Sequence, residues 1–171
     1  MKQIFITAFS LFLSIVVFSQ DSVKTEKYYR VKGTNIKIIP PKYFMTMPSA
    51  PNVLIHPSTS SSIQVNEIKG LGYPMSIKKL TTEYIEQQGA KVIYRKDTLT
   101  LDGKKGTLFL LRFKVKGKDA NRTEMEYERF MFFTGNYNNT IWISANYPLI
   151  AKETIAPVLL HSVLSATFTE Q

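Results

Sequence analysis

Hydrophobic and polar residues alternate along most of the second half of the chain, as they do in β-strands that bury one face. The same alternation occurs once earlier, where Ile63 and Val65 lie between polar neighbours. Short polar turns separate the later segments, the clearest being Asp102-Gly103. Strands joined by such turns pair antiparallel, so the pattern predicts a meander. The predicted strands are residues 62–68, 92–101, 107–116, 124–134 and 139–146, the last four forming the meander.

Two segments have helical spacing instead. The first begins with Ser76 as a candidate N-cap and ends at Gly89. Its apolar stripe is Ile77, Leu80, Thr81, Tyr84 and Ile85. The second covers residues 151–167 and contains Pro157, which would break a helix interior. We therefore expect Thr154 to be the N-cap of the second helix, so that the proline falls in the first turn.

Before the first long strand, the chain contains shorter and less regular segments. Residues 29–32 and 36–39 are predicted to be extended, on either side of Gly33. Residues 42–60 hold three prolines and a Ser/Thr cluster, which predicts irregular coil.

This order of elements predicts an α+β fold. Two amphipathic helices need apolar sheet faces to pack on. In the strand 107–116, Leu108 and Leu110 point away from Phe109 and Leu111, so both faces are apolar there. We predict one domain over residues 28–171, a layered α/β/α sandwich around a mainly antiparallel meander sheet with two main helices.

The strand 107–116 is also basic, and the formal net charge of the whole chain is +9. Such a strand could bind nucleic acid or a membrane, or it could be paired within the sheet. The next strand carries Glu124, Glu126 and Glu128 at the same spacing of two. If the loop 117–123 closes a hairpin, Lys116, Lys114 and Arg112 lie opposite these three carboxylates. The basic strand is therefore interpreted as part of the sheet, and no nucleic acid is expected.

The same register matches the apolar side chains on the other face of the hairpin. Phe109 meets Met131, and Phe113 meets Tyr127. A shift by one residue would place carboxylates against apolar side chains, so the pattern specifies this register. Its one poor match puts Leu111 beside Arg129.

The amino-terminal residues predict export. Lys2 precedes an apolar run from Ile4 to Phe18, and Val17 and Ser19 fit a signal-peptidase site before Gln20. We expect residues 1–19 to be a signal peptide and residues 20–27 to be a polar lead-in, which leaves a periplasmic or secreted protein without a stable membrane anchor. The alternative is an uncleaved anchor, for which the run is short.

The sequence offers little recognisable chemistry for an enzyme. The chain has no cysteine, which excludes disulfides, thiol nucleophiles and cysteine-based zinc sites. Its two histidines, His56 and His161, lie in no metal-binding spacing, and no serine lies in a nucleophile elbow. The glutamates 124, 126 and 128 have basic partners, unlike the carboxylate pair of a glycosidase. Trp142, the only tryptophan, is expected in the core. We predict no catalytic residue, cofactor or metal.

Several of these segments resemble the PsbP/Mog-type fold superfamily. The resemblance rests on Ile38-Ile39-Pro40, the strand from Ile63 to Glu67, the hairpin from Leu101 to Gly106 and the Tyr147-Pro148 exit into the closing helix. It covers about residues 29–169. It implies a binding or accessory role, because the superfamily shares no catalytic constellation.

Three function hypotheses follow. The first is an exported, non-enzymatic binding or accessory protein of the cell envelope, acting on a protein or envelope component. The second is a module that binds an acidic polymer or an anionic membrane surface through lysines left unpaired, and the third is a hydrolase. The candidate partner contacts are Lys104, Lys105, Lys118, His56 and Ser60.

Overall fold

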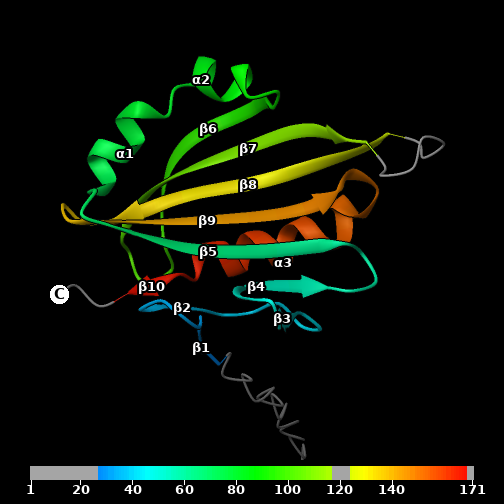
Figure 1. Cartoon of the computed structure of the whole chain (residues 1–171), viewed down its shortest axis with the longest axis horizontal. Helices are drawn as coiled ribbons and strands as arrows, with labels where there is room; N and C mark the ends of the chain where they lie inside the picture. Colours follow the sequence, from blue (N-terminus) through cyan, green and yellow to red (C-terminus); the bar gives the residue numbers. More distant parts are fainter. Residues whose placement is uncertain (1–26, 117–123, 169–171) are drawn as a thin grey trace, which may run out of the picture.

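The computed structural model describes residues 27–116 and 124–168 (Figure 1). The predicted signal peptide, all of the lead-in but Lys27, and the loop 117–123 with Lys118 lie outside these residues. The main sheet has seven strands, and all neighbours pair antiparallel. In spatial order they are β3 (Met45–Met47), β4 (Ala50–His56), β5 (Ser61–Lys69), β9 (Asn139–Pro148), β8 (Met125–Gly135), β7 (Lys105–Val115) and β6 (Lys91–Leu99).

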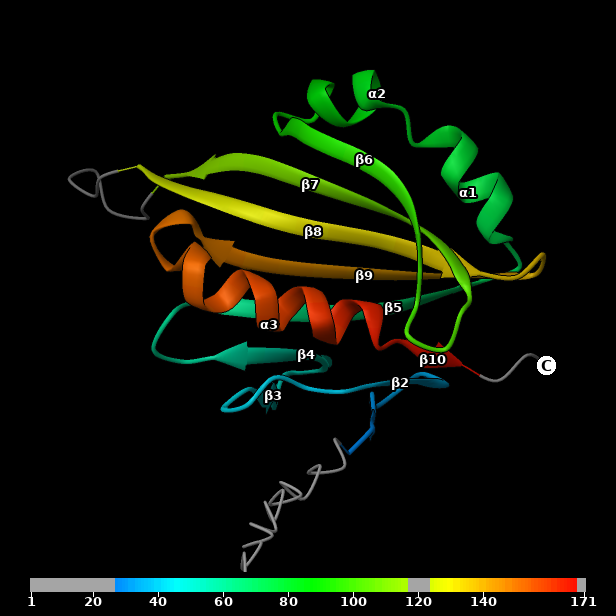
Figure 2. The same cartoon turned by 180° about the vertical axis from the view of Figure 1, so that it is seen from behind.

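Helices cover both faces of this sheet. On one face, α1 (Tyr73–Lys79) and α2 (Thr82–Gln87) pack over β6 to β9. On the other, the short 3-10 helix η1 (Leu149–Ala151) leads into α3 (Lys152–Leu164), which lies in front of β9 and β5 in Figure 2. The predicted α+β layered sandwich is confirmed.

A second, small sheet lies beside the end of α3 (Figures 1 and 2). Its strands are β1 (Tyr29–Arg30), β2 (Ile36–Ile38) and β10 (Thr167–Phe168), with β2 in the middle. Ile36 and Ile38 are buried and belong to the core under α3, so this sheet closes that side of the molecule.

The core is divided by the sheet, as the two apolar faces of β7 predict. Leu108 and Leu110 belong to the larger core under α3, whereas Phe109 and Leu111 belong to a smaller core under α1 and α2. All four side chains are buried. Alternation along one strand thus supplies both cores.

The predicted register of the β7–β8 hairpin is confirmed from Gly106/Thr134 to Val115/Met125. The expected ion pairs are only partly present. Arg112 does pair with Glu128, but Glu128 is completely buried under the start of α3 rather than on a solvated face. Lys114 pairs with Glu124, at 3.2 Å, instead of with Glu126 directly opposite. Long, exposed side chains reach diagonal neighbours in a sheet, so register alone does not determine their partners.

The predicted first helix is broken into two. Leu80 leaves the helical conformation, and the Thr81 hydroxyl accepts a hydrogen bond from the Tyr84 backbone N–H, which makes Thr81 the N-cap of α2. Ser76 is not an N-cap. It lies inside α1, buried, with its hydroxyl 2.7 Å from that of Thr140.

Two other predictions about local structure are wrong. The segment predicted as coil contains β3 and β4, and Pro51 lies in β4 outside its residues paired with β5, Val53–His56. The closing helix begins at Lys152 rather than after Thr154, so Pro157 lies inside α3 and not in its first turn.

Candidate functional site

A cavity of about 610 Å³ opens between the α1–α2 segment and the main sheet. Its floor comes from successive strands, with Leu111 on β7, Met131 and Phe133 on β8, and Trp142 on β9. The break between α1 and α2 forms part of its roof, through Leu80. The remaining lining residues are Ile68, Leu71, Ser76, Lys79, Tyr84, Ile85, Gln88, Ala90 and Arg129. A mostly apolar cavity of this size is typical of small-molecule sites.

Aromatic rings make the floor rigid. Phe133 stacks on Trp142 with ring centroids 6.0 Å apart, and Phe109 meets Phe133 edge-on at 6.2 Å. Trp142 is only half-buried, so the predicted core position is only partly correct. Its indole N–H is buried, yet it has no hydrogen-bond acceptor among the described residues. Such an unpaired donor in a cavity wall is an unusual feature of a folded protein.

Arg129 brings a positive charge into this apolar cavity. Its Nε donates to Asn146 Oδ1, and its guanidinium lies 4.8 Å from the centre of the Phe113 ring. Burial lowers the pKa of Arg129, because the charged form loses hydration. No carboxylate in the described part of the chain lies within ion-pair distance of it. In the predicted register, Arg129 was the one poor match, because it lies opposite Leu111. That mismatch was the only indication of this site in the sequence.

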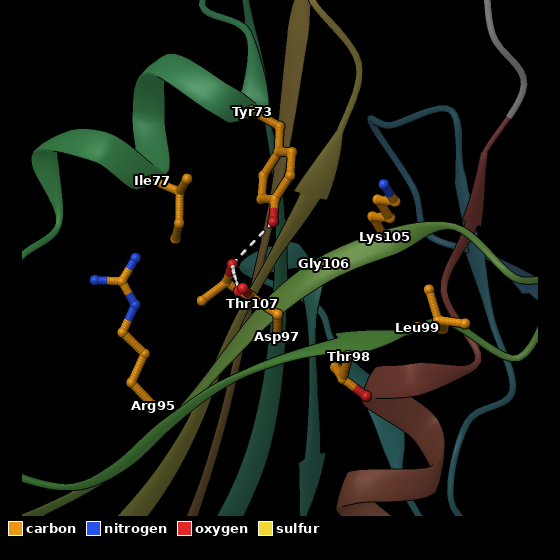
Figure 3. A pocket seen from close by; sticks show the side chains of 9 residues that line it. All are labelled: Tyr73, Ile77, Arg95, Asp97, Thr98, Leu99, Lys105, Gly106 and Thr107. Atoms are coloured by element: carbon orange, nitrogen blue, oxygen red, sulfur yellow. Dashed lines mark hydrogen bonds between the residues drawn. The ribbon is translucent and has the colours of Figure 1, made fainter.

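A second hollow, of about 540 Å³, lies on the other side of α1 (Figure 3). Tyr73 reaches down from α1 to Thr107 on β7, with their hydroxyls 2.8 Å apart, and Thr107 donates to Asp97 Oδ1 at the same distance. Because Thr107 has one proton to give, Tyr73 donates to Thr107. All three polar groups are thus paired, and this chain of bonds ties α1 to the sheet.

Among the described residues, Glu128 is the charged group with the most hydrogen-bond partners, and it lies on the sheet face opposite the cavity. Its carboxylate accepts from Arg112 Nη2 and Tyr147 Oη, both at 2.7 Å, and from Lys152 Nζ. Burial alone would raise the pKa of Glu128, but hydrogen bonds from Arg112, Tyr147 and Lys152 outweigh burial and lower it. A carboxylate held ionised by three donors is a poor general acid. Glu128 therefore joins β7, β8, β9 and the start of α3.

The same cluster perturbs its other members. Burial, followed by the hydrogen bond to Glu128, raises the pKa of Tyr147 well above its usual value. Burial, followed by the negative charge of Glu128, also raises the pKa of Tyr94. Both phenols stay neutral, so neither acts as a base, and Tyr147 is a hydrogen-bond donor to Glu128.

The candidate partner contacts do not form one site. Lys104 donates from Nζ to the Phe168 carbonyl and lies 3.6 Å from the centre of the Phe168 ring, so it is not the unpaired residue that the sequence suggested. Lys105 begins β7 and is exposed. Lys104 lies in the turn between β6 and β7 and Lys105 directly follows it, at one end of the main sheet.

His56 and Ser60 flank the turn between β4 and β5, at the other end of the sheet (Figure 1). The His56 ring packs on Phe44 and its Nδ1 is 3.0 Å from the Thr59 hydroxyl. Ser60 has a left-handed backbone, with φ 53°. Lys118 lies outside the described residues. Contact of any of these residues with a partner stays a prediction.

Two further observations concern the described part of the chain. No three side chains of histidine, cysteine, aspartate or glutamate gather there in a way that would hold a metal ion. None of its helices combines the length and the apolar character that crossing a membrane requires.

Comparisons with known proteins identify the fold. No protein-family model matches the chain, and no curated protein matches it in sequence. Among solved structures, cyanobacterial PsbP (CyanoP) of Synechocystis sp. PCC 6803 matches with a TM-score of 0.53 and 13% identity, over 90% of this chain and 99% of that one. The Ran-binding protein Mog1p of Saccharomyces cerevisiae matches with a TM-score of 0.52 and 11% identity, over 83% and 94%. The chain has the PsbP/Mog-type fold.

Proposed function

We propose that this chain is an exported, non-enzymatic binding protein that holds an apolar group of its ligand in the cavity beneath α1 and α2. The observation that carries the proposal is the cavity itself, with its apolar lining and aromatic floor. Its volume of about 610 Å³ suits a small molecule or part of one.

Other features support a binding role over catalysis. Glu128 is completely buried, and its carboxylate accepts hydrogen bonds from Arg112 and Tyr147. It lies on the sheet face opposite the cavity. The chain of hydroxyls through Tyr73 and Thr107 ends on Asp97, with each member paired. PsbP and Mog1p share the fold at low identity, and Mog1p is described as Ran-binding, which is compatible with a scaffold for binding.

The single tryptophan lies in the cavity wall and provides a direct test. The uncharged dye N-phenyl-1-naphthylamine should bind the purified protein and accept excitation energy from Trp142. Filling the cavity by Ala90→Phe should reduce this energy transfer at least tenfold. Ala50→Phe, at a half-buried position away from the cavity, is the matched control and should bind like the wild type.

The roof variant Leu80→Gln serves as a second test should Ala90→Phe fail to fold, because it makes the cavity polar without filling it. Saturable energy transfer that both cavity variants weaken would support the proposal. Equal transfer in all folded variants, or no transfer in the wild type, would refute it.

Export requires its own test, because it rests on the apolar run that ends at Phe18. The protein produced in a Gram-negative host should be found in the periplasm or the medium, and its intact mass should correspond to a chain beginning at Gln20. A protein that keeps residues 1–19 and stays with the membrane would instead indicate an uncleaved anchor.

A further inference from the structure

The charges that line the cavity are all of one sign. Arg129 on β8 and Lys79 at the end of α1 both line it, and no aspartate or glutamate of residues 27–116 and 124–168 does. On the opposite face of the same sheet, by contrast, the cations Arg112 and Lys152 share the buried carboxylate of Glu128. Arg112 and Lys152 are thus neutralised by a carboxylate of the same chain. Arg129 and Lys79 in the cavity have no such partner among the described residues.

Arg129 is the more constrained of the two cavity cations. A guanidinium has five N–H donors, and the only protein acceptor for Arg129 in the described part of the chain is Asn146 Oδ1, which takes the Nε–H. The Phe113 ring lies against it, at 4.8 Å, and restricts its movement. A partly buried cation with no counter-charge among the described residues loses hydration, and an anion bound beside it would offset that loss.

Polar side chains on the neighbouring strands hold Arg129 from behind the cavity wall. Asn146 lies opposite Arg129 on β9, and its amide donates in turn to the Ser62 hydroxyl on β5. The two terminal nitrogens of the guanidinium remain for a ligand, and their planar fork matches the two oxygens of a carboxylate. Apart from Ser76, Gln88 and Lys79, the rest of the wall is aliphatic, aromatic or thioether.

We propose that the ligand is an amphipathic anion, a free aliphatic monocarboxylate, whose chain occupies the cavity and whose carboxylate binds Arg129. This rests on the proposed function and adds the ligand class to it. Met131 and Leu111 supply an adaptable surface for a hydrocarbon chain, and Lys79 adds a second positive charge at the roof. A folded protein partner does not fit a cavity of about 610 Å³.

The test compares three molecules with the same chain and different head groups, dodecanoate, dodecanol and dodecyltrimethylammonium, each kept below its micelle concentration. Trp142 fluorescence reports occupancy of the cavity, and calorimetry gives the stoichiometry. We expect one dodecanoate per chain, bound at least tenfold more tightly than the alcohol and more tightly still than the cation. Added salt should narrow the difference.

Variants of Arg129 then locate the head group. Arg129→Gln should bind all three molecules with affinities within about threefold of one another, and Arg129→Lys should keep a reduced preference for the anion. Arg30→Gln removes an exposed arginine of the small sheet and is the matched control, which should keep the full preference. The wild-type comparison needs no variant, so it remains decisive if Arg129→Gln does not fold.

The possible failures are distinct. If the uncharged dye binds but dodecanoate has no advantage over dodecanol, the cavity binds apolar groups and the inference about the anion is wrong. If neither the dye nor any of the three molecules binds, both the proposed function and the inference about the anion are wrong. If Arg129→Gln keeps the preference for dodecanoate, the carboxylate does not bind Arg129, and the assignment of the head group is wrong.

Discussion

At the scale of single residues, Glu128 and Arg129 show how one strand serves two purposes. They are adjacent on β8, and strand alternation directs them to opposite faces of the sheet. Glu128 is fully buried and has three donors, whereas Arg129 has one neutral acceptor and an aromatic ring. The carboxylate of Glu128 is therefore neutralised within the fold, and the guanidinium of Arg129 remains available to a ligand.

Removing the carboxylate should destabilise the fold moderately. Breaking a fully buried ion pair costs about 3 to 5 kcal/mol. Here the side chains of Arg112 and Lys152 are 37% and 40% exposed and can turn to water, so only the Tyr147 hydroxyl is stranded. We expect Glu128→Ala to lower the free energy of unfolding by about 2 to 3 kcal/mol, measured by urea denaturation.

Two further variants check this reasoning. Arg112→Met removes the nearest cation from the buried carboxylate and should cost more than Glu128→Ala, whereas Lys114→Ala breaks an exposed pair and should cost less than about 1 kcal/mol. Equal costs for Glu128→Ala and Lys114→Ala would show that the buried cluster contributes nothing particular to stability.

The stability should also depend on pH through Glu128. Its pKa in the folded protein lies below the usual value of 4.5, so the unfolded chain takes up the proton first as the pH falls. The stabilisation is therefore complete well above pH 4.5 and is lost as the pH falls through 4.5 toward the lowered pKa. Denaturation midpoints measured between pH 7 and pH 3 should fall less steeply for Glu128→Gln than for the wild type.

A control is available at an exposed site. Hydrogen bonds to its own backbone N–H and to Thr81 also lower the pKa of Glu83, so that residue contributes with the same sign. Glu83→Gln should leave most of the pH dependence in place. A larger effect of Glu83→Gln than of Glu128→Gln would contradict the assignment to the buried cluster.

At the scale of elements, the strands of the meander were predictable and the helix boundaries were not. Period-two alternation together with opposite charges at matching spacing determined the β7–β8 register residue by residue. The stripe of Ile77, Leu80 and Ile85 continues across the break between α1 and α2, so periodicity alone predicted one helix. Prolines concealed β3 and β4 because one of them, Pro51, lies within β4 itself.

Pro157 gives a test at this scale. It lies exposed inside α3, where proline is about 3 kcal/mol less favourable than alanine, while the stiffening of the unfolded chain by proline returns about 0.4 to 1 kcal/mol. Pro157→Ala should therefore raise the free energy of unfolding by about 2 kcal/mol in chemical denaturation.

The neighbouring exposed residue provides the comparison. Val158→Ala changes helix propensity only slightly and should shift stability by less than about 1 kcal/mol. A loss of stability in Pro157→Ala would mean that the proline makes packing contacts worth more than a helical hydrogen bond, for example with Pro40 and Pro41, which line the same surface hollow.

At the scale of the whole molecule, the cavity is what the sequence could not reveal. It depends on where α1 and α2 rest on the sheet, and Tyr73 and Ser76 fix α1 there through bonds to Thr107 and Thr140, which are 34 and 64 residues away in the chain. Only Arg129 carried a local signal, as a charge on a face of otherwise apolar partners. The fold itself follows from patterns that span neighbouring segments.

The two faces should differ in their local stability. In the described part of the chain, the core under α3 has 18 buried hydrophobic residues and the core under α1 and α2 has 5. Segments with little buried apolar surface open without global unfolding. Amide hydrogens of α1 and α2 should exchange at lower free energies than those of β8 and β9 in native-state hydrogen exchange measured by mass spectrometry.

The same measurement links opening to binding. A ligand in the cavity should slow exchange in α1 and α2 and leave α3 unchanged. Uniform protection of all elements, with or without ligand, would show that the molecule opens only as one unit and that the roof does not move separately.

The separation of the two cores has a consequence for protein engineering. Leu111, Met131 and Tyr84 line the cavity and take no part in the hydrogen bonds of Glu128, so they can be varied for new ligands. Most changes there should leave the larger core intact, because the sheet separates the two. A library randomised at these three positions and screened through Trp142 would retain both the scaffold and its built-in reporter.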